Sequence, residues 1–139
     1  MIATVAQSAM NRLRQTRVPR NGAIIFDIDD TLIKSSGGLI NPVKRLYDLA
    51  GRMGLVLFIV TNRAGTKSNI QWTHTELEQY GITGYNTAYF RDPECSDMWH
   101  PKRSARKNIY DRGFETVMSV GDKKWDIGEY GGVGVIIPS

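Results

Sequence analysis

Cysteine is almost missing from this sequence of 139 residues, which contains only Cys95. A single thiol cannot form an internal disulfide, and it has no second thiol with which to build a zinc site. Nothing in the sequence therefore demands an oxidising compartment, and we expect a cytoplasmic setting. Proline is also scarce, with 5 residues against 14 glycines, and 41% of the residues are hydrophobic. This composition is typical of a globular domain and excludes a disordered or fibrous chain.

Long hydrophobic runs are absent as well. The longest extends only from Leu55 to Val60. A helix needs about 20 apolar residues to cross a bilayer, so the sequence predicts neither a membrane span nor a membrane partner.

The N-terminal residues 1–22 contain no acidic residue and four arginines, Arg12, Arg14, Arg17 and Arg20. They lack the apolar stretch and the small-residue cleavage site of a secretory signal. A mitochondrial presequence shares this composition, but so does an ordinary N-terminal helix or a basic tail, and we favour these two over the presequence. We expect a basic segment over residues 1–22 and one domain over residues 23–139.

Short apolar runs alternate with stretches of helical length. The runs are typical of buried strands and cover Ala23–Phe26, Leu55–Val60, Thr87–Phe90, Val117–Val120 and Val133–Ile137. The helical stretches are Pro42–Met53, Lys67–Tyr80 and Pro101–Asp111, and a glycine follows closely after each. This alternation predicts right-handed crossovers and a mostly parallel sheet. The expected fold is a doubly wound, three-layer α/β/α domain of Rossmann type.

Polar residues gather where the predicted strands end. They are Asp27, Asp29, Thr61, Asn62, Arg63, Asp122 and Asp126. In such sheets the ligand lies beyond the carboxyl ends of the strands, so we expect these side chains to converge. Unit charges about 4 Å apart interact by roughly 4 kcal/mol at an effective dielectric of about 20, so converging carboxylates need a cation. Mg²⁺ takes oxygen ligands and pairs carboxylates with phosphate, and Asp27, Asp122 and Asp126 suit it.

Three segments resemble motifs of the haloacid dehalogenase (HAD) superfamily of phosphohydrolases. FDIDDTL at 26–32 is similar to the first motif, DxDxT, and VTN at 60–62 is similar to the second. SVGDKKWD at 119–126 resembles the fourth motif, GDxxxD. The third motif is a basic residue near the start of the helix before the fourth-motif strand. Lys102 suits this position best, and Lys107 is the rival.

Within the superfamily, the sequence is similar to the branch that holds bacterial acid phosphatases. The shared pattern is VTNR, then Thr73, Leu77, Gly81, Lys102 and Arg106, then GD. Those acid phosphatases are longer and secreted, so we do not carry over their substrates. Residues 31–55 and 63–101 are too short for the large cap that many members insert there. The resemblance therefore implies an open pocket, minimal or capless.

The resemblance implies catalytic roles that agree with the chemistry of the residues. Asp27 is the expected nucleophile, which forms an aspartyl phosphate, and Asp29 is the expected general acid and base. The Thr61 hydroxyl and the Lys102 ammonium are expected to hold phosphoryl oxygens, with Asn62 and Arg63 contributing to substrate binding. The implied Mg²⁺ ligands are Asp27, the backbone carbonyl of Asp29, Asp122 and Asp126. The predicted activity is that of a Mg²⁺-dependent phosphomonoester hydrolase.

The substrate class stays open at this stage. Open-pocket relatives act on bulky substrates such as phosphoproteins or nucleic-acid ends, or borrow a neighbouring subunit of a homo-oligomer as a lid. The net charge of +4 and the cluster Lys102, Arg103, Arg106 and Lys107 favour a nucleic-acid end, but a small phosphomonoester or nucleotide fits equally well. Three tryptophans, Trp72, Trp99 and Trp125, suit either base stacking or the rim of a core.

Two non-enzymatic functions are alternatives to phosphomonoester hydrolysis. A phosphoacceptor domain of the receiver type also combines clustered aspartates, a Thr or Ser, a Lys and Mg²⁺ on a doubly wound sheet. In receivers, however, the phosphorylated Asp is separated in sequence from the acidic pair, whereas Asp27 and Asp29 share one turn here. A silent binding module on the same fold would be expected to have lost one of these two residues, and both are present.

Overall fold

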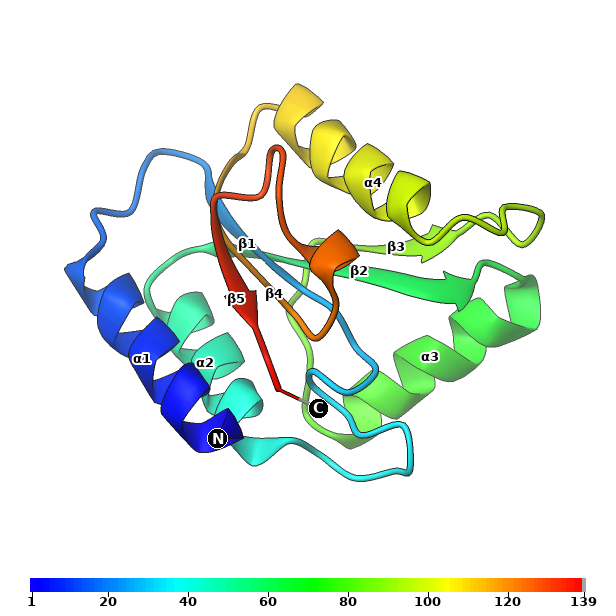
Figure 1. Cartoon of the computed structure of the whole chain (residues 1–139), viewed down its shortest axis with the longest axis horizontal. Coiled ribbons are helices and arrows are strands. Elements are labelled where there is room, and N and C mark those ends of the chain that lie inside the picture. The colour runs from blue at the N-terminus through cyan, green and yellow to red at the C-terminus, as the bar shows by residue number, and fades with distance from the viewer. Residues whose placement is uncertain (139) are drawn as a thin grey trace.

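In the computed structural model, which describes residues 1–138, five strands form one parallel sheet between two layers of helices (Figure 1). The strands are β1 (Gly22–Phe26), β2 (Val56–Ala64), β3 (Thr87–Arg91), β4 (Glu115–Gly121) and β5 (Val133–Ile136). They pair in the order β3-β2-β1-β4-β5, and every pair is parallel. This confirms the predicted doubly wound fold, and each strand expected from the sequence overlaps an observed one.

Four α-helices and one short 3-10 helix complete the structure. They are α1 (Ile2–Gln15), α2 (Asn41–Arg52), α3 (Lys67–Gln79), α4 (Trp99–Asp111) and the 3-10 helix η1 (Lys124–Asp126). Strand β1 is buried along its whole length because helices cover both faces of the sheet. Its Ile24 and Phe26 join the larger core with α1, α2 and α3, whereas Ala23 and Ile25 join a smaller core with α4. The molecule therefore has three layers.

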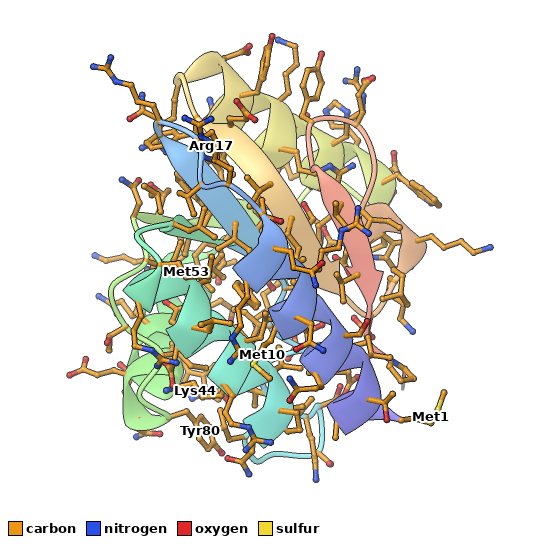
Figure 2. The ribbon with its side chains drawn as sticks, turned by 90° about the vertical axis from the view of Figure 1, so that its left-hand side faces the viewer. Met1, Met10, Arg17, Lys44, Met53 and Tyr80 are labelled. Atoms are coloured by element: carbon orange, nitrogen blue, oxygen red, sulfur yellow. The ribbon has the colours of Figure 1, made fainter. Side chains whose placement is uncertain are left out.

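Helix α1 lies within the N-terminal segment of residues 1–22. It packs beside α2 (Figure 2) and buries four side chains, Ala6, Ala9, Met10 and Leu13. Its basic residues Arg12 and Arg14 occupy the last turn, where cations interact favourably with the helix dipole. We propose that α1 folds as one unit with the domain expected over residues 23–139, of which Ser139 lies outside the described residues.

The strand order reverses beside β1, and this reversal fixes where a ligand can bind. Strands β2 and β3 lie on one side of β1, and β4 and β5 lie on the other. Phe26 of β1 pairs with Val120 of β4, and the Asp27 backbone N–H donates to the Val120 carbonyl at 2.9 Å. The segments that leave β1 and β4 therefore emerge side by side, at the point where open α/β sheets bind ligands.

The connections around this edge of the sheet are short. Residues 27–40 link β1 to α2, and residues 92–98 link β3 to α4. Neither connection contains a folded unit, so residues 1–138 carry no cap domain, as the sequence predicts. Over the same residues, no helix has both the length and the apolar character that a membrane span requires.

The packing of α1 generates a stability prediction. We expect Leu13→Ala to lower the free energy of unfolding by about 2–4 kcal/mol, because Leu13 is fully buried against the core and its removal leaves a cavity. Arg14→Ala, at an exposed position of the same helix, is the matched control, and its effect should stay within about 0.5 kcal/mol. Urea unfolding followed by circular dichroism measures both. Equal midpoints for Leu13→Ala and the wild type would show that α1 is a detachable segment.

Candidate active site

A pocket of about 270 Å³ opens at the carboxyl ends of β1, β2 and β4. The residues that line it include Asp27, Asp29, Asn62, Arg63, Lys102 and Asp122. Asp126 adjoins Asp27 and Lys102 in the buried space next to this pocket. The structure therefore brings together side chains from four segments that lie far apart in the sequence.

A tight turn after β1 places the Asp27 side chain. The Ile28 backbone carbonyl accepts hydrogen bonds from the backbone N–H groups of Thr31 at 3.1 Å and Leu32 at 2.9 Å. Ile28 itself is buried and anchors the turn to the core. The Thr31 hydroxyl donates to Asp27 Oδ2 at 3.3 Å. Thr31 therefore braces the turn, and the Asp27 carboxyl is held at the strand end.

Lys102 of α4 is the central cation of the site. Its side chain is only 2% exposed, and its Nζ donates to Asp27 Oδ1 at 2.9 Å and to the Val60 carbonyl at 2.7 Å. The same Nζ forms an ion pair with Asp126 Oδ1. Burial alone would lower the pKa of Lys102, but the two adjacent carboxylates outweigh it and the pKa is raised. Lys102 therefore stays charged, and its ammonium group faces the Asp27 carboxylate, the Val60 carbonyl and the Asp126 carboxylate.

Lys107, the rival for the same role, lies elsewhere. Its Nζ donates to Asp111 Oδ2 at 2.8 Å on the exposed face of α4. The basic cluster on this helix is divided, because Lys102 and Arg106 are buried while Arg103 and Lys107 are exposed. The exposed pair is bound to acidic partners, so α4 does not present a continuous basic surface.

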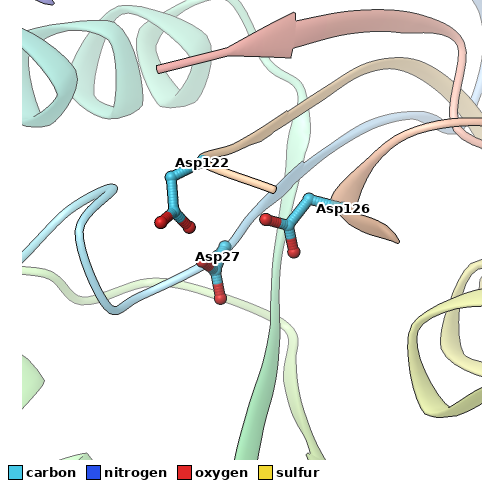
Figure 3. A group of neighbouring side chains, drawn as sticks. All are labelled: Asp27, Asp122 and Asp126. Atoms are coloured by element: carbon cyan, nitrogen blue, oxygen red, sulfur yellow. The ribbon is translucent and has the colours of Figure 1, made fainter. Parts of the chain in front are cut away.

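Three carboxylates approach one another at this point of the site (Figure 3). One oxygen from each of Asp27, Asp122 and Asp126 lies within 4.8 Å of the others. Burial raises the pKa of Asp27 from its ordinary value of 3.8 to about 6, although Lys102 opposes the rise. Buried Lys102 and exposed Lys123, whose Nζ lies 3.8 Å from Asp122 Oδ2, still leave the three ionised carboxylates with negative charge in excess. An all-oxygen donor set of this kind fits a hard divalent cation, which would favour the ionised form of Asp27.

The loop after β4 is built to hold Asp126 beside Asp27. A Cβ atom at Gly121 would lie only 2.2 Å from Asp126 Cβ, so the loop requires glycine there. The Lys123 backbone N–H donates to Asp126 Oδ2 at 3.0 Å. Buried Arg106 donates to the carbonyls of Trp125 at 2.8 Å and Glu129 at 2.9 Å. Arg106 therefore supports the acidic loop from behind.

The residues in the last part of β2, which extends further than the apolar run predicts, make contacts with their neighbours. Thr61 is buried, and its hydroxyl accepts a hydrogen bond from the Arg63 backbone N–H at 3.1 Å. Asn62 lines the pocket, and its amide donates to the Met98 carbonyl at 3.1 Å. Arg63 Nη2 and Nε donate to the two carboxylate oxygens of Asp29 at 2.8 and 3.0 Å. Arg63, expected to bind substrate, is thus paired with the predicted general acid.

Sequence reasoning did not find the pairing of Arg63 with Asp29, nor the support that Arg106 gives to the acidic loop. Both residues belong to the acid-phosphatase pattern, which was the available signal. A pattern of residue types does not report which groups a guanidinium contacts. Aromatic residues also surround the site: Trp125 lines the pocket and packs edge-on against Trp99, and Trp72 lies beside Arg63.

This arrangement contains the parts of a phosphoryl-transfer site. The buried carboxylate of Asp27 adjoins the Lys102 ammonium, and with Asp122 and Asp126 it suits a metal ion. The Asp29 carboxyl lies on the same turn as Asp27 and lines the pocket. Phosphoryl transfer depends on positioning and on cations that neutralise the charge of the transferred group.

Comparison with known proteins gives both a family and a fold. The model of the HAD superfamily, subfamily IIIB (acid phosphatase), matches residues 35–135. The search of the curated proteins gave no match. Among solved structures, a chain of the Pnkp1/Rnl/Hen1 complex superposes with a TM-score of 0.75 and 16% identity, covering 88% of this chain and 47% of that one.

Two further structures have the same fold. A chain of the Pnkp1/Rnl/Hen1 RNA repair complex gives a TM-score of 0.68 at 15% identity, covering 85% of this chain and 42% of that chain. The class C acid phosphatase from Bacillus anthracis with tungstate bound gives 0.62 at 15% identity, covering 91% of this chain and 62% of that one. This chain thus spans about half the length of the first two structures, and these likenesses show the fold alone.

The burial of Lys102 generates a stability prediction with a definite pH dependence. We expect Lys102→Met to lower the free energy of unfolding by about 3–5 kcal/mol, because the Asp27 and Asp126 carboxylates lose their buried ammonium. Without it the folded-state pKa of Asp27 rises further, so the folded variant binds protons that the unfolded chain releases. The free energy of unfolding of the variant should therefore fall as pH rises. Its difference from the wild type should be smaller at about pH 5 than at about pH 8.

The matched control for this experiment is Lys107→Met, which removes an exposed pair on the same helix. Denaturant unfolding of both variants at the two pH values measures the difference. Similar, pH-independent losses in the two variants would contradict the role given to Lys102.

Proposed function

This chain belongs to the HAD superfamily, subfamily IIIB, the acid phosphatases, and from that membership we propose that it is a metal-dependent phosphomonoester hydrolase with Asp27 as nucleophile. The observation that carries the proposal is the position of Asp27. It lies at the strand reversal, fixed by Lys102 and within reach of a common ion with Asp122 and Asp126. Such a carboxylate can attack phosphorus and accept the phosphoryl group.

We propose that Mg²⁺ is the resident ion. Asp27, the Asp29 backbone carbonyl, Asp122 and Asp126 would hold it, and when bound it would neutralise charge on the phosphoryl group. On the protein side, Lys102 fixes one Asp27 oxygen and supplies a permanent positive charge at the same point. Thr61 would add a hydroxyl from the second half of β2. These groups orient the phosphate for in-line attack.

Hydrolysis proceeds in two displacements in this proposal. In the first, an Asp27 oxygen bonds to phosphorus, the bond from phosphorus to the leaving oxygen breaks, and the Asp29 carboxyl gives that oxygen a proton. In the second, Asp29 takes a proton from water as the water oxygen bonds to phosphorus. The bond between Asp27 and phosphorus then breaks, and inorganic phosphate and free Asp27 are released. One carboxyl thus serves as acid and then as base.

Phosphate release tests this activity directly. We expect metal-dependent phosphate release from p-nitrophenyl phosphate, nucleoside monophosphates or phosphorylated oligonucleotides, and loss of release when EDTA removes the metal. Asp27→Asn should lower kcat by about 1,000-fold or more, because it removes the nucleophile while preserving its size. Thermal unfolding checks that this variant keeps its fold. A folded wild type that releases no phosphate from any ester, a phosphopeptide included, would support a phosphoacceptor or binding role instead.

A nucleic-acid end is a second candidate substrate, favoured by exposed aromatic rings around the site. Trp99 is 54% exposed and packs against Trp125 of the pocket lining, and Trp72 is 60% exposed beside Arg63. Bases stack on such rings without regard to sequence. Two of the similar structures are chains of Pnkp1/Rnl/Hen1 complexes, one of them described as an RNA repair complex, which supports the same substrate class.

A Trp99 variant tests whether the substrate is a nucleic-acid end. If the ester is a nucleic-acid end, Trp99→Ala should raise KM for a 3′- or 5′-phosphorylated oligonucleotide by about tenfold, in line with a stacking free energy of about 1–3 kcal/mol. KM for p-nitrophenyl phosphate should stay unchanged, because that ester has no base to stack. Steady-state kinetics on both esters measures the contrast. An equal change in KM for the two esters would show that Trp99 has a structural role only. A small phosphomonoester would then remain the preferred substrate.

A further inference from the structure

Arg63 connects three elements of the candidate site. It lies near the end of β2, and its guanidinium reaches both the turn after β1 and helix α3. On the turn it binds the two carboxylate oxygens of Asp29. On α3, its Nη1 donates to the Thr73 hydroxyl at 3.1 Å and lies 2.8 Å from Glu76 Oε1 in an ion pair.

The contacts of this guanidinium leave little capacity for a substrate. A guanidinium has five N–H donors, and every nitrogen of Arg63 is engaged by Asp29, Thr73 or Glu76. Trp72 covers one face of the group, with its ring centroid 5.2 Å from the guanidinium carbon. The Arg63 side chain is only 14% exposed. Arg63 lines the pocket, but all three of its guanidinium nitrogens contact protein groups.

Asp29 depends on this contact for its orientation. Its side chain is 45% exposed, and within residues 1–138 the structure gives its carboxylate no side-chain partner other than Arg63. A bidentate contact between arginine and a carboxylate fixes the plane of the carboxylate as well as its position. A half-exposed carboxyl without such a contact samples several rotamers. The structure thus holds Asp29 by one planar clamp, anchored on α3.

We infer that Arg63 is a positioning residue for the general acid and base, which acts through Asp29 and not by binding the phosphoryl group. The inference rests on the proposed function, since it assigns the proton-transfer role to Asp29. Thr73 and Glu76 are the anchor of the clamp, because they hold Nη1 while Nη2 and Nε hold Asp29. Helix α3 thereby contributes to catalysis without lining the pocket.

A positioning role has a kinetic signature that a structural role lacks. Proton donation matters most when the leaving oxygen is a poor leaving group, and matters little when that oxygen departs readily as an anion. Phenyl phosphate and p-nitrophenyl phosphate have similar shapes but differ in this property. The constant kcat/KM is the suitable measure, because it reports only the steps up to transfer of the phosphoryl group to Asp27.

The experiment compares Arg63→Gln with the wild type on these two esters. We expect kcat/KM to fall by about 100-fold for phenyl phosphate and by no more than about tenfold for p-nitrophenyl phosphate. In the Asp29→Asn background, Arg63→Gln should lower kcat/KM for p-nitrophenyl phosphate by less than about twofold further, because the group that it positions is already gone. Arg45→Gln makes the same chemical change at an exposed position of α2 and should leave both esters unaffected.

The outcomes separate this inference from the proposed function. A wild type that hydrolyses neither ester overturns the proposed function, and the inference with it. If the wild type is active and Arg63→Gln lowers kcat/KM for both esters by the same factor, the inference alone is overturned. It is also overturned if Arg63→Gln lowers kcat/KM by the same factor in the Asp29→Asn background as in the wild type. If Arg63→Gln does not fold, Glu76→Gln removes the anchor on α3, and a larger loss for phenyl phosphate than for p-nitrophenyl phosphate is again the expected result.

Discussion

The buried ammonium of Lys102 is the interaction on which the rest of the site depends. It joins α4 to the end of β1, to β2 and to the loop after β4, through Asp27, the Val60 carbonyl and Asp126. Ions in a protein interior lose their hydration, and the cost is recovered only where each charge meets partners in good geometry. Lys102 meets that condition, because its ammonium group lies against two carboxylates and a backbone carbonyl. Its position therefore fixes both the arrangement of the strand ends and the charge that Asp27 faces.

The topology of the sheet explains why these residues meet. Strand order reverses beside β1, so the segments leaving β1 and β4 lie next to each other while α4 crosses the opposite face from α2. Asp27 follows directly after β1, and Asp122 follows directly after β4. A doubly wound sheet thus provides the same crevice to many chemistries, and the chemistry comes from the residues placed there. Here they are carboxylates around one fixed cation.

The sequence predicted the strands and the polar residues at their ends because both depend on local patterns. The run Ala23–Phe26 is apolar throughout, as a central strand must be, and Asp27 is the first polar residue after it. The choice between Lys102 and Lys107 needed the third dimension, since residues five apart on a helix occupy different faces. The pairing of Arg63 with Asp29 was also out of reach, because it joins β2 to the turn after β1 through side chains only. The sequence did not distinguish an N-terminal helix from a basic tail, since the four side chains that α1 buries are ordinary small or apolar residues.

The most direct test of the account is to trap the enzyme during turnover of a phosphomonoester with acid and to map the covalently bound phosphate by peptide mass spectrometry. An aspartyl phosphate survives in acid long enough to be located. The account predicts one phosphoryl group on Asp27 in the wild type, a larger trapped fraction in Asp29→Asn when p-nitrophenyl phosphate is the substrate, and none in Asp27→Asn. Phosphate bound at another residue, or turnover that continues in Asp27→Asn, would contradict it.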